Sequence, residues 1–473
     1  MLFISATFAI FTAAVFIFYY IPCLRKYQIH ILIIASLLFY GYNNPYNIII
    51  LIISILINSI ISYEIHIHKR YALLLTVAGI ITNILILSFF KYNTFITHAL
   101  SMNASIPEKM MHYIISISLP LGISYYTFQA ISLIIDSYRQ TTNMTKENIK
   151  IGGFIDHAKN SALFLSFFPK QSSGPIITAN RFFPQLSEKF FQSIDWRSTF
   201  KLLIAGLFFK LVIADNLKEY TFWIRYPEFT ALSSIDLIIL MHAYAFQFFA
   251  DFAGYSLIAI GIGHLFGYSL PMNFNYPYIA TSCSDFWSRW HISLSSWLRD
   301  YLYIPLGGNR KGALRTGVNL LLVMVIAGVW HGATLNFLLW GLWHGIGLVA
   351  GTVLKIFFGP RNGNSMIRNI VKIFLIFHFV SIGWLFFKLP EASHVYAYLA
   401  SIANNLFIKP NMKNMIPIFI YSSPVIIHHI FYYVKNSGKL KFLSKYDYVF
   451  YGLLLFFILL NKGDENAFIY FQF

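Results

Sequence analysis

The sequence predicts an all-α polytopic membrane protein with about 12 crossings, and three observations support this prediction. Hydrophobic residues make up 57% of the 473 residues and charged residues only 11%, whereas a soluble domain carries roughly 25% charged residues. The apolar residues come in runs close to the roughly 20 residues that a spanning helix needs. Lys and Arg gather between the runs and give a formal net charge of +17, which is typical of cytoplasmic loops. A soluble enzyme and a nucleic-acid-binding protein are therefore disfavoured.

The expected crossings follow the apolar runs, of which the two shortest are alternatively buried or re-entrant pieces. The runs lie at about 3–20, 28–42, 46–63, 71–90, 113–137, 199–214, 236–268, 317–331, 335–356, 369–387, 414–434 and 446–460. Basic residues after the first and third runs predict that these loops face the cytoplasm. Both chain ends then face the outside, including a C-terminal extracytoplasmic tail over residues 461–473.

Two regions do not fit a simple crossing. Residues 155–180 contain two lysines and the break Ser172-Ser173-Gly174-Pro175, which predicts a re-entrant segment. Residues 272–312 are too polar to face lipid but are rich in Trp and Tyr. Irregular backbone at membrane depth survives only where it is buried in protein or lines a wet cavity. Since no repeat or separate soluble segment is present, the whole chain, 1–473, is predicted to form a single membrane domain.

The stretch 285–312 is the most informative part of the sequence. Its first half suits a continuous helix that Pro305, Gly307 and Gly308 end. One face of this helix would carry Trp287, His291, Leu294 and Leu298. Its basic residues include Arg289, Arg299, Arg310 and Lys311. The stretch predicts either an amphipathic helix at the headgroup level or a cationic mouth that binds an anionic donor, such as a phosphopantetheine thioester.

A charge-free run from Gly317 to Leu354 contains the same triplet twice, as Trp330-His331-Gly332 and Trp343-His344-Gly345. An ionisable side chain inside hydrocarbon is costly and indicates function. A buried, neutral imidazole accepts a proton, which is what acyl transfer to a hydroxyl requires. We therefore expect His331 to act as a general base. For His344 a structural hydrogen bond to a neighbouring helix is the favoured alternative.

Other polar groups in the apolar runs have simpler interpretations. Asp251 is interpreted as structural or paired, with a role in a proton path as the alternative. Neither the histidine pairs at 66–68 and 428–429 nor the two cysteines have the spacing of a metal site, so no metal is predicted.

Five stretches resemble the membrane-bound O-acyltransferase family, in the bacterial branch that acetylates alginate, peptidoglycan and related envelope polymers. They are LPLGISYYTFQAISLIIDSYR at 119–139, FLSFFPKQSSGPI at 164–176, DFAGYSLIAIGIGHLFGYSLPMNFNYPY at 251–278, RWHISLSSWLRDYLYIPLGGNR at 289–310 and GVWHG at 328–332. The family-like core therefore covers residues 119–345.

The resemblance implies a mechanism and its residues. The family's histidine in the WHG motif falls on His331, the expected base, with Trp330 beside it on the donor side. The second family histidine, in the RWH motif, falls on His291, near the donor. The helices would surround a central funnel or tunnel, where a cytoplasmic thioester, acetyl-CoA or an acyl carrier protein, meets an external acceptor. No bound cofactor is expected.

The same resemblance implies a setting and partners. We expect a multi-pass protein of the bacterial cytoplasmic (inner) membrane, in contact with lipid. A separate periplasmic Ser/His/Asp O-acetyltransferase would deliver the acetyl group to the polymer, because this chain has no such domain. Ser172 and Ser173 are more similar to the branch that D-alanylates teichoic acids, so D-alanyl transfer is kept as an alternative.

The tail, Phe468-Ile469-Tyr470-Phe471-Gln472-Phe473, resembles the C-terminal motif of a small partner protein in the D-alanylation system. This resemblance implies that Tyr470 carries the acyl group from the thioester to the external transferase. A phenol has a pKa of roughly 10, so Tyr470 would need a base such as His331. The alternative is an aromatic anchor at the membrane surface.

Two further classes compete with an enzyme. A proton-coupled transporter would use the histidines and Asp251 as a relay, but transporters usually show two halves with matching interrupted helices, and no such symmetry is seen. A purely structural membrane subunit leaves the buried histidines unexplained.

Overall fold

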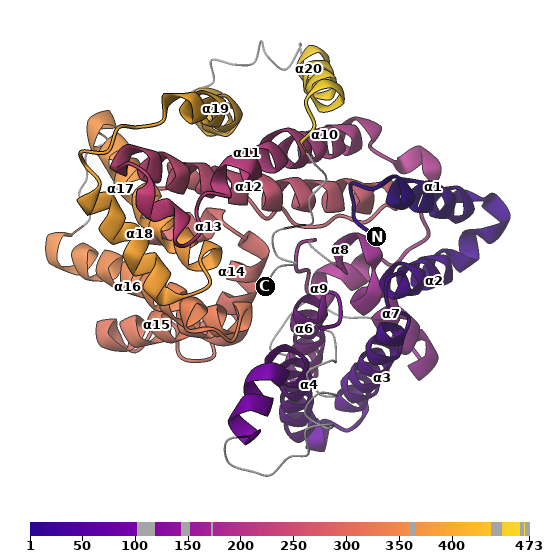
Figure 1. The fold of residues 1–473 in the computed structure, drawn as a ribbon. Helices are drawn as coiled ribbons and strands as arrows, with labels where there is room; N and C mark the ends of the chain where they lie inside the picture. Colours follow the sequence, from indigo (N-terminus) through magenta and orange to yellow (C-terminus); the bar gives the residue numbers. More distant parts are fainter. Residues whose placement is uncertain are drawn as a thin grey trace. The chain divides into compact units, whose positions relative to one another are not determined.

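The computed structural model describes residues 1–101, 119–142, 152–171, 174–359, 365–436, 447–463 and 468. Over these residues the chain forms helices and no strand (Figure 1), and it divides into two compact units. Unit 1 comprises Met1–Phe200 with Ala259–Pro271, and unit 2 comprises Lys201–Ile258 with Met272–Phe473. That residues 1–473 form a single membrane domain stays a prediction.

Unit 1 contains the N-terminal helices. The longer ones are α1 (Ala6–Tyr20), α2 (Gln28–Gly41), α3 (Tyr46–Ile67), α4 (Ala72–Ser101) and α6 (Ile123–Thr141). The segment predicted to be re-entrant forms three helices that are too short to span a bilayer: α7 (Phe154–Ser166), α8 (Phe168–Gln171) and α9 (Ala179–Phe182). Lys170 of α8 is buried and donates to Gln129 Oε1 and to the carbonyl of Phe164. Ser172 and Ser173 lie outside the described residues.

Unit 2 contains the helices that hold the predicted chemistry. They are most of α10 (Trp196–Leu207), the π-helix η5 (Phe208–Ala214), α11 (Asp215–Thr221), most of α12 (Ser234–Leu265), α13 (Cys283–Arg289), α14 (Ile292–Leu298), the π-helix η8 (Arg299–Tyr303), α15 (Gly312–His331), α16 (Leu335–Phe358), α17 (Met366–Lys388), α18 (Ala392–Asn404), α19 (Met412–Asn436) and α20 (Asp447–Leu460).

The two triplet-bearing helices, α15 and α16, form a tight hairpin (Figure 1). Glycine makes this close approach possible. A Cβ on Gly328 would lie 2.2 Å from the carbonyl oxygen of Phe337, and one on Gly341 would lie 2.5 Å from that of Met324. Small residues let transmembrane helices approach to backbone contact. The hairpin fixes His331, the last residue of α15, against the first turns of α16.

Eight of the described helices are long and apolar enough to cross a membrane. They are Pro22–Gly41, Tyr46–Ile67, Lys69–Asn93, Ser234–Leu265, Gly312–His331, Leu335–Phe357, Met366–Lys388 and Met412–Tyr432. The all-α, multi-pass prediction is confirmed, whereas the count of twelve crossings is not established. The first and last predicted runs form shorter apolar helices, Ala6–Tyr20 and Asp447–Leu460. The run at 199–214 is divided between α10 and η5, and the run at 113–137 begins outside the described residues.

Candidate functional site

His331 ends α15 and is surrounded by aromatic rings. Its side chain is buried, with 5% of the residue exposed. The centroid of its ring lies 4.7 Å from that of Trp330, 5.0 Å from that of Trp340 and 5.1 Å from that of Phe387. The next residue is Gly332, and a larger residue would not fit there because its Cβ would lie 2.3 Å from the ring of Phe337. The predicted base is therefore held in an apolar, aromatic pocket at the turn of the hairpin.

His344 lies one helical turn after Trp340 on α16, so the two side chains share a face. Its residue is 0% exposed, and its ring centroid lies 5.0 Å from that of Trp340 and 5.1 Å from that of Trp287. The other rings around it are those of Phe286, Phe379 and Trp384. Within the described part of the chain neither ring nitrogen has a hydrogen-bond partner. The structure thus does not support the structural hydrogen bond favoured as the alternative for His344.

Gly383 of α17 makes room for His344. A Cβ at Gly383 would lie only 2.7 Å from His344 Nε2 and 3.3 Å from Trp343 Cδ1. The neighbouring indole of Trp343 points to the same helix and donates to the carbonyl of Phe379 at 2.9 Å. Helix α17 therefore packs against the face of α16 that carries Trp343 and His344.

His291 corrects the prediction of a continuous helix over the first half of 285–312. The helix is interrupted, because His291 adopts a left-handed conformation with φ of 42° between α13 and α14. The break is stabilised by an upstream segment: Asn275 N donates to Arg289 O, and Ile292 N donates to Asn273 O, both at 2.9 Å. Local periodicity does not reveal these hydrogen bonds, since their partners lie outside the stretch.

The break also changes where His291 points. Its ring is 1% exposed and packs 4.7 Å from the ring of Phe252 on α12. Burial lowers the pKa of His291 to about 3, so its ring is neutral at physiological pH. The ring centroid of its neighbour, Trp290, lies 4.7 Å from that of Trp384. The structure thus brings His331 and His344 together around Trp340, whereas His291 lies against α12.

The predicted basic residues divide into two groups. Arg289 Nε donates to Asp285 Oδ1 at 2.6 Å and Arg299 Nε to Asp300 Oδ1 at 2.7 Å. Their charges are therefore balanced locally. Arg310 and Lys311 are exposed, just before the start of α15. Only the second group keeps the character of a cationic surface that can attract an anionic donor.

A buried charge cluster lies elsewhere in unit 2. Lys210 Nζ, on the π-helix η5, lies 2.6 Å from Asp215 Oδ1 and 2.8 Å from Asp251 Oδ1. All three side chains are nearly inaccessible. The interpretation of Asp251 as a paired residue is confirmed. The π-helix, a form that is frequent at functional sites, was not predicted from sequence.

The described part of the C-terminal tail packs into unit 2. Phe468 is 0% exposed, and its ring lies 4.6 Å from that of Tyr255 and 5.6 Å from that of Phe252. Upstream, Gly463 N donates to Leu211 O at 2.9 Å. Tyr470 lies outside the described residues.

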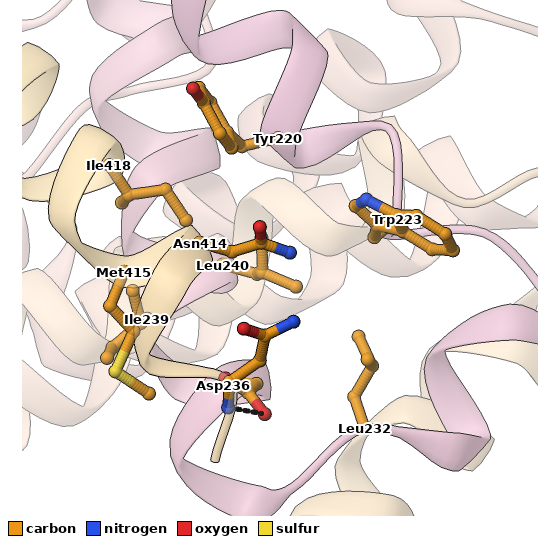
Figure 2. A pocket seen from close by; sticks show the side chains of 10 residues that line it. Tyr220, Trp223, Leu232, Asp236, Ile239, Leu240, Asn414, Met415 and Ile418 are labelled. Carbon is orange, nitrogen blue, oxygen red and sulfur yellow. Dashed lines mark hydrogen bonds between the residues drawn. The ribbon is translucent and has the colours of Figure 1, made fainter.

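A separate pocket lies between the first turns of α12 and α19, with a volume of about 130 Å³ (Figure 2). Figure 2 shows Tyr220, Trp223 and Asn414 among the side chains that line it. Asp236 at its base accepts a hydrogen bond from Asn411 N at 3.1 Å. None of the described residues predicted for the chemistry lines this pocket. It is therefore distinct from the aromatic site around His331.

Sequence reasoning missed the tryptophans that join the two histidines. Trp340 was detectable, because it precedes His344 by four residues on one helix and thus shares its face. Trp287 was placed only on the His291 face of the predicted helix. Its contact with Trp340, 5.7 Å between centroids, joins segments more than fifty residues apart.

Comparison with known proteins shows which family and which relatives this chain resembles. Residues 156–389 match the model of the membrane-bound O-acyltransferase family. The chain is 33% identical to a peptidoglycan O-acetyltransferase of Helicobacter pylori, over 93% of this chain and 91% of that protein. It is 33% identical to the probable alginate O-acetylase AlgI of Pseudomonas aeruginosa, over 80% and 72% of the two chains. It is 30% identical to a teichoic acid D-alanyltransferase of Bacillus subtilis, over 66% and 76%.

Proposed function

Because the chain belongs to the membrane-bound O-acyltransferase family and is an acyltransferase, we propose that it takes an acetyl group from a cytoplasmic thioester and moves it across the membrane. The acetyl group serves O-acetylation of a cell-envelope polysaccharide, peptidoglycan or an alginate-like polymer. The donor is acetyl-CoA or an acyl carrier protein. The observation that carries this proposal is the burial of His331 among aromatic rings at the turn of the α15–α16 hairpin.

His331 acts as the general base in the proposed reaction. It takes the proton from the acceptor hydroxyl as that oxygen attacks the thioester carbonyl carbon. The resulting tetrahedral intermediate collapses, the C–S bond breaks, and the thiolate receives the proton from His331. Exclusion of water by the surrounding rings protects the thioester from hydrolysis.

The donor is bound through Arg310 and Lys311, whose exposure leaves them accessible to phosphate groups. Trp330 packs against the ring of His331 on the side where the donor binds. His291, which is buried and neutral, lies at the break between α13 and α14 and forms part of the donor-binding side of the site. Arg289 and Arg299 contribute indirectly, because each already pairs with an aspartate.

The first acceptor is the phenol of Tyr470, and the acetyl ester is then passed to a separate periplasmic Ser/His/Asp O-acetyltransferase. The proposed location is the bacterial inner membrane. The burial of Phe468 in unit 2 supports a docked tail. Tyr470→Phe removes only the hydroxyl, so this variant should be inserted normally but acetylate no polymer. Full acetylation by Tyr470→Phe would reduce the tail to a membrane anchor.

The central test uses membranes that contain wild-type protein, His331→Ala or His331→Gln, with radioactive acetyl-CoA as donor. We expect both variants to be inserted at wild-type levels and to lose roughly 10²–10⁴-fold in transfer rate. A near wild-type rate in either variant would show that His331 is structural.

D-alanyl transfer is the second candidate, favoured by the 30% identity to the Bacillus subtilis teichoic acid D-alanyltransferase. The same membranes supplied with a D-alanyl-loaded carrier protein separate the two. Transfer of D-alanine but not acetate would replace the acetyl proposal while leaving the role of His331 intact.

A further inference from the structure

Three polar aromatic side chains of unit 2 form a mutual cluster, here called the indole–imidazole cluster: Trp287, Trp340 and His344. The ring centroids lie 5.7 Å apart for Trp287 and Trp340, 5.1 Å for Trp287 and His344, and 5.0 Å for Trp340 and His344. Trp287 comes from α13, and the other two come from consecutive turns of α16. Each ring therefore contacts both of the others.

Every side-chain nitrogen of this cluster is buried and lacks a hydrogen-bond partner within the part of the chain that the structure describes. Native proteins satisfy the large majority of buried polar atoms, so a concentration of exceptions requires an explanation. The requirement is stricter inside a membrane, where lipid offers no alternative partner. Trp343, on the same helix, shows the usual behaviour because its N–H donates to Phe379 O at 2.9 Å.

The chemistry of the cluster restricts its ligand. An indole N–H is a donor only, so the atom that Trp287 and Trp340 bind must be an acceptor. The rings packed around His344 besides these two are aromatic and uncharged, those of Phe286, Phe379 and Trp384. Such surroundings suit an oxygen that is neutral when it binds, such as a carbonyl, better than a phosphate or carboxylate, which would have to lose the hydration of a full charge on binding. The ring of Trp340 also lies 5.0 Å from that of His331, so the ligand atom is held close to the base.

We propose that the indole–imidazole cluster binds the carbonyl oxygen of the acyl thioester and stabilises the oxyanion that develops on it. This inference rests on the thioester reaction proposed above. As the acceptor oxygen attacks, the carbonyl π-electrons move onto this oxygen while His331 holds the proton. When the C–S bond breaks, the electrons return to re-form the carbonyl, and the thiolate leaves with the proton from His331. Donors aimed at such an oxygen stabilise the transition state more than the bound substrate.

The test replaces each indole with a ring that has no N–H: Trp340→Phe and Trp287→Phe, with Trp343→Phe as the matched control. We expect kcat for transfer from acetyl-CoA to fall roughly 10²–10³-fold in the first two variants, as for loss of one oxyanion donor, with little change in the donor KM. Each variant loses the volume of the larger ring, so the melting temperature should fall moderately in both, with no added cost from the deleted N–H, which has no partner to lose. Trp343→Phe also loses its hydrogen bond to Phe379 O, so it should keep wild-type kcat while its melting temperature falls for both reasons.

His344 is tested by a pair of variants. His344→Phe removes every polar atom and should lower kcat, while His344→Gln keeps a donor and should recover part of the rate. A role in packing alone predicts the opposite order, because Phe fills an aromatic box better than Gln. If both variants retain wild-type kcat, His344 is not a donor.

A second measurement does not depend on variant activity. Indole ¹H–¹⁵N resonances of the wild-type protein in detergent are followed while an amide analogue of acetyl-CoA, with N–H in place of the thioester sulfur, is added. The Trp287 and Trp340 signals should shift and the Trp343 signal should not. Wild-type kcat in both Trp287→Phe and Trp340→Phe, or unshifted signals at saturation, would overturn the inference. Failure of the wild-type protein to use any thioester would instead overturn the proposed function, so the two failures are distinguishable.

Discussion

His331 and His344 share one neighbour, since the ring centroid of each lies 5.0 Å from that of Trp340. The histidines of the two WHG triplets are therefore parts of one aromatic site rather than independent features of two helices. Backbone contact at Gly328 and Gly341 holds α15 and α16 close enough for this arrangement. A change that moves either helix of the hairpin should therefore disturb both histidines.

Gly383→Ala tests the space behind His344. The new Cβ would lie 2.7 Å from His344 Nε2, and the rings of Trp287, Trp340 and Phe379 restrict how far the imidazole can turn away. Overpacking of this kind typically lowers stability by about 1–3 kcal/mol, and we also expect a loss of acetyl transfer because the ring is displaced. Thermal unfolding in detergent and the radioactive transfer assay measure the two effects.

The control for this variant is Gly351→Ala on α16. No atom lies within 4 Å of the added Cβ at that position, so the change should be neutral or stabilising by up to about 1 kcal/mol. Equal behaviour of Gly383→Ala and Gly351→Ala would mean that the His344 ring has room to move.

The double variant Arg310→Glu/Lys311→Glu tests the exposed part of the basic region. Exposed charge contacts are worth up to about 1 kcal/mol each, so the reversal should raise the donor KM roughly tenfold. The effect should shrink at high salt, because exposed charges are screened. Steady-state transfer at several acetyl-CoA concentrations and two ionic strengths measures it.

Lys409→Glu is the comparison for that experiment, because Lys409 is also exposed but lies between α18 and α19. It should leave the donor KM unchanged. An unaltered KM in the double variant would reduce Arg310 and Lys311 to ordinary basic residues of a membrane loop.

Hydropathy predicted the helical, multi-pass class because the bilayer imposes one length and one composition on every crossing. It did not establish the count, and the described helices show why. Helix α6, which overlaps the run 113–137, is not among the helices apolar enough to cross, and the run at 199–214 contains Lys210 within the π-helix η5. Length and polarity alone do not distinguish a crossing from a helix buried in protein.

The candidate site was predictable only where its residues are local in sequence. The WHG motif identified His331, and helical spacing relates Trp340 to His344. The contact between Trp287 and Trp340 and the break at His291 depend on pairings between distant segments, such as Ile292 with Asn273. No periodicity within 285–312 carries that information, so the continuous helix expected there was wrong.

Lys210→Met tests the buried charge cluster. Lys210 is the cation that both Asp215 and Asp251 contact, at 2.6 and 2.8 Å. Removing one partner from a buried ion pair is typically destabilising by about 3–5 kcal/mol, because the remaining charge loses its compensation. We expect a large drop in melting temperature, and partial recovery when Asp251→Asn is added to the same chain.

Lys159→Met supplies the contrast, since the pair of Lys159 with Asp156 at 2.7 Å is at the surface. Its loss should change stability by no more than about 1 kcal/mol. Similar small effects for Lys210→Met and Lys159→Met would show that the cluster contributes no net stability.

Phe468→Ala tests whether the tail is held in unit 2. Phe468 is fully buried against Tyr255 and Phe252, and Phe252 in turn contacts the ring of His291. Truncation of a buried Phe to Ala typically removes about 3–5 kcal/mol, and here this energy holds the segment around Phe468 in unit 2. We therefore expect release of the tail, seen as faster proteolysis and hydrogen exchange of the C-terminal peptide, before global unfolding. Polymer acetylation should fall together with this release if Tyr470 carries the acetyl group.

Phe468→Leu keeps most of the buried volume and should retain both protection and activity. A Phe468→Ala protein whose tail is released but which still acetylates polymer at the wild-type rate would separate tail docking from acyl transfer, and would exclude Tyr470 as the carrier.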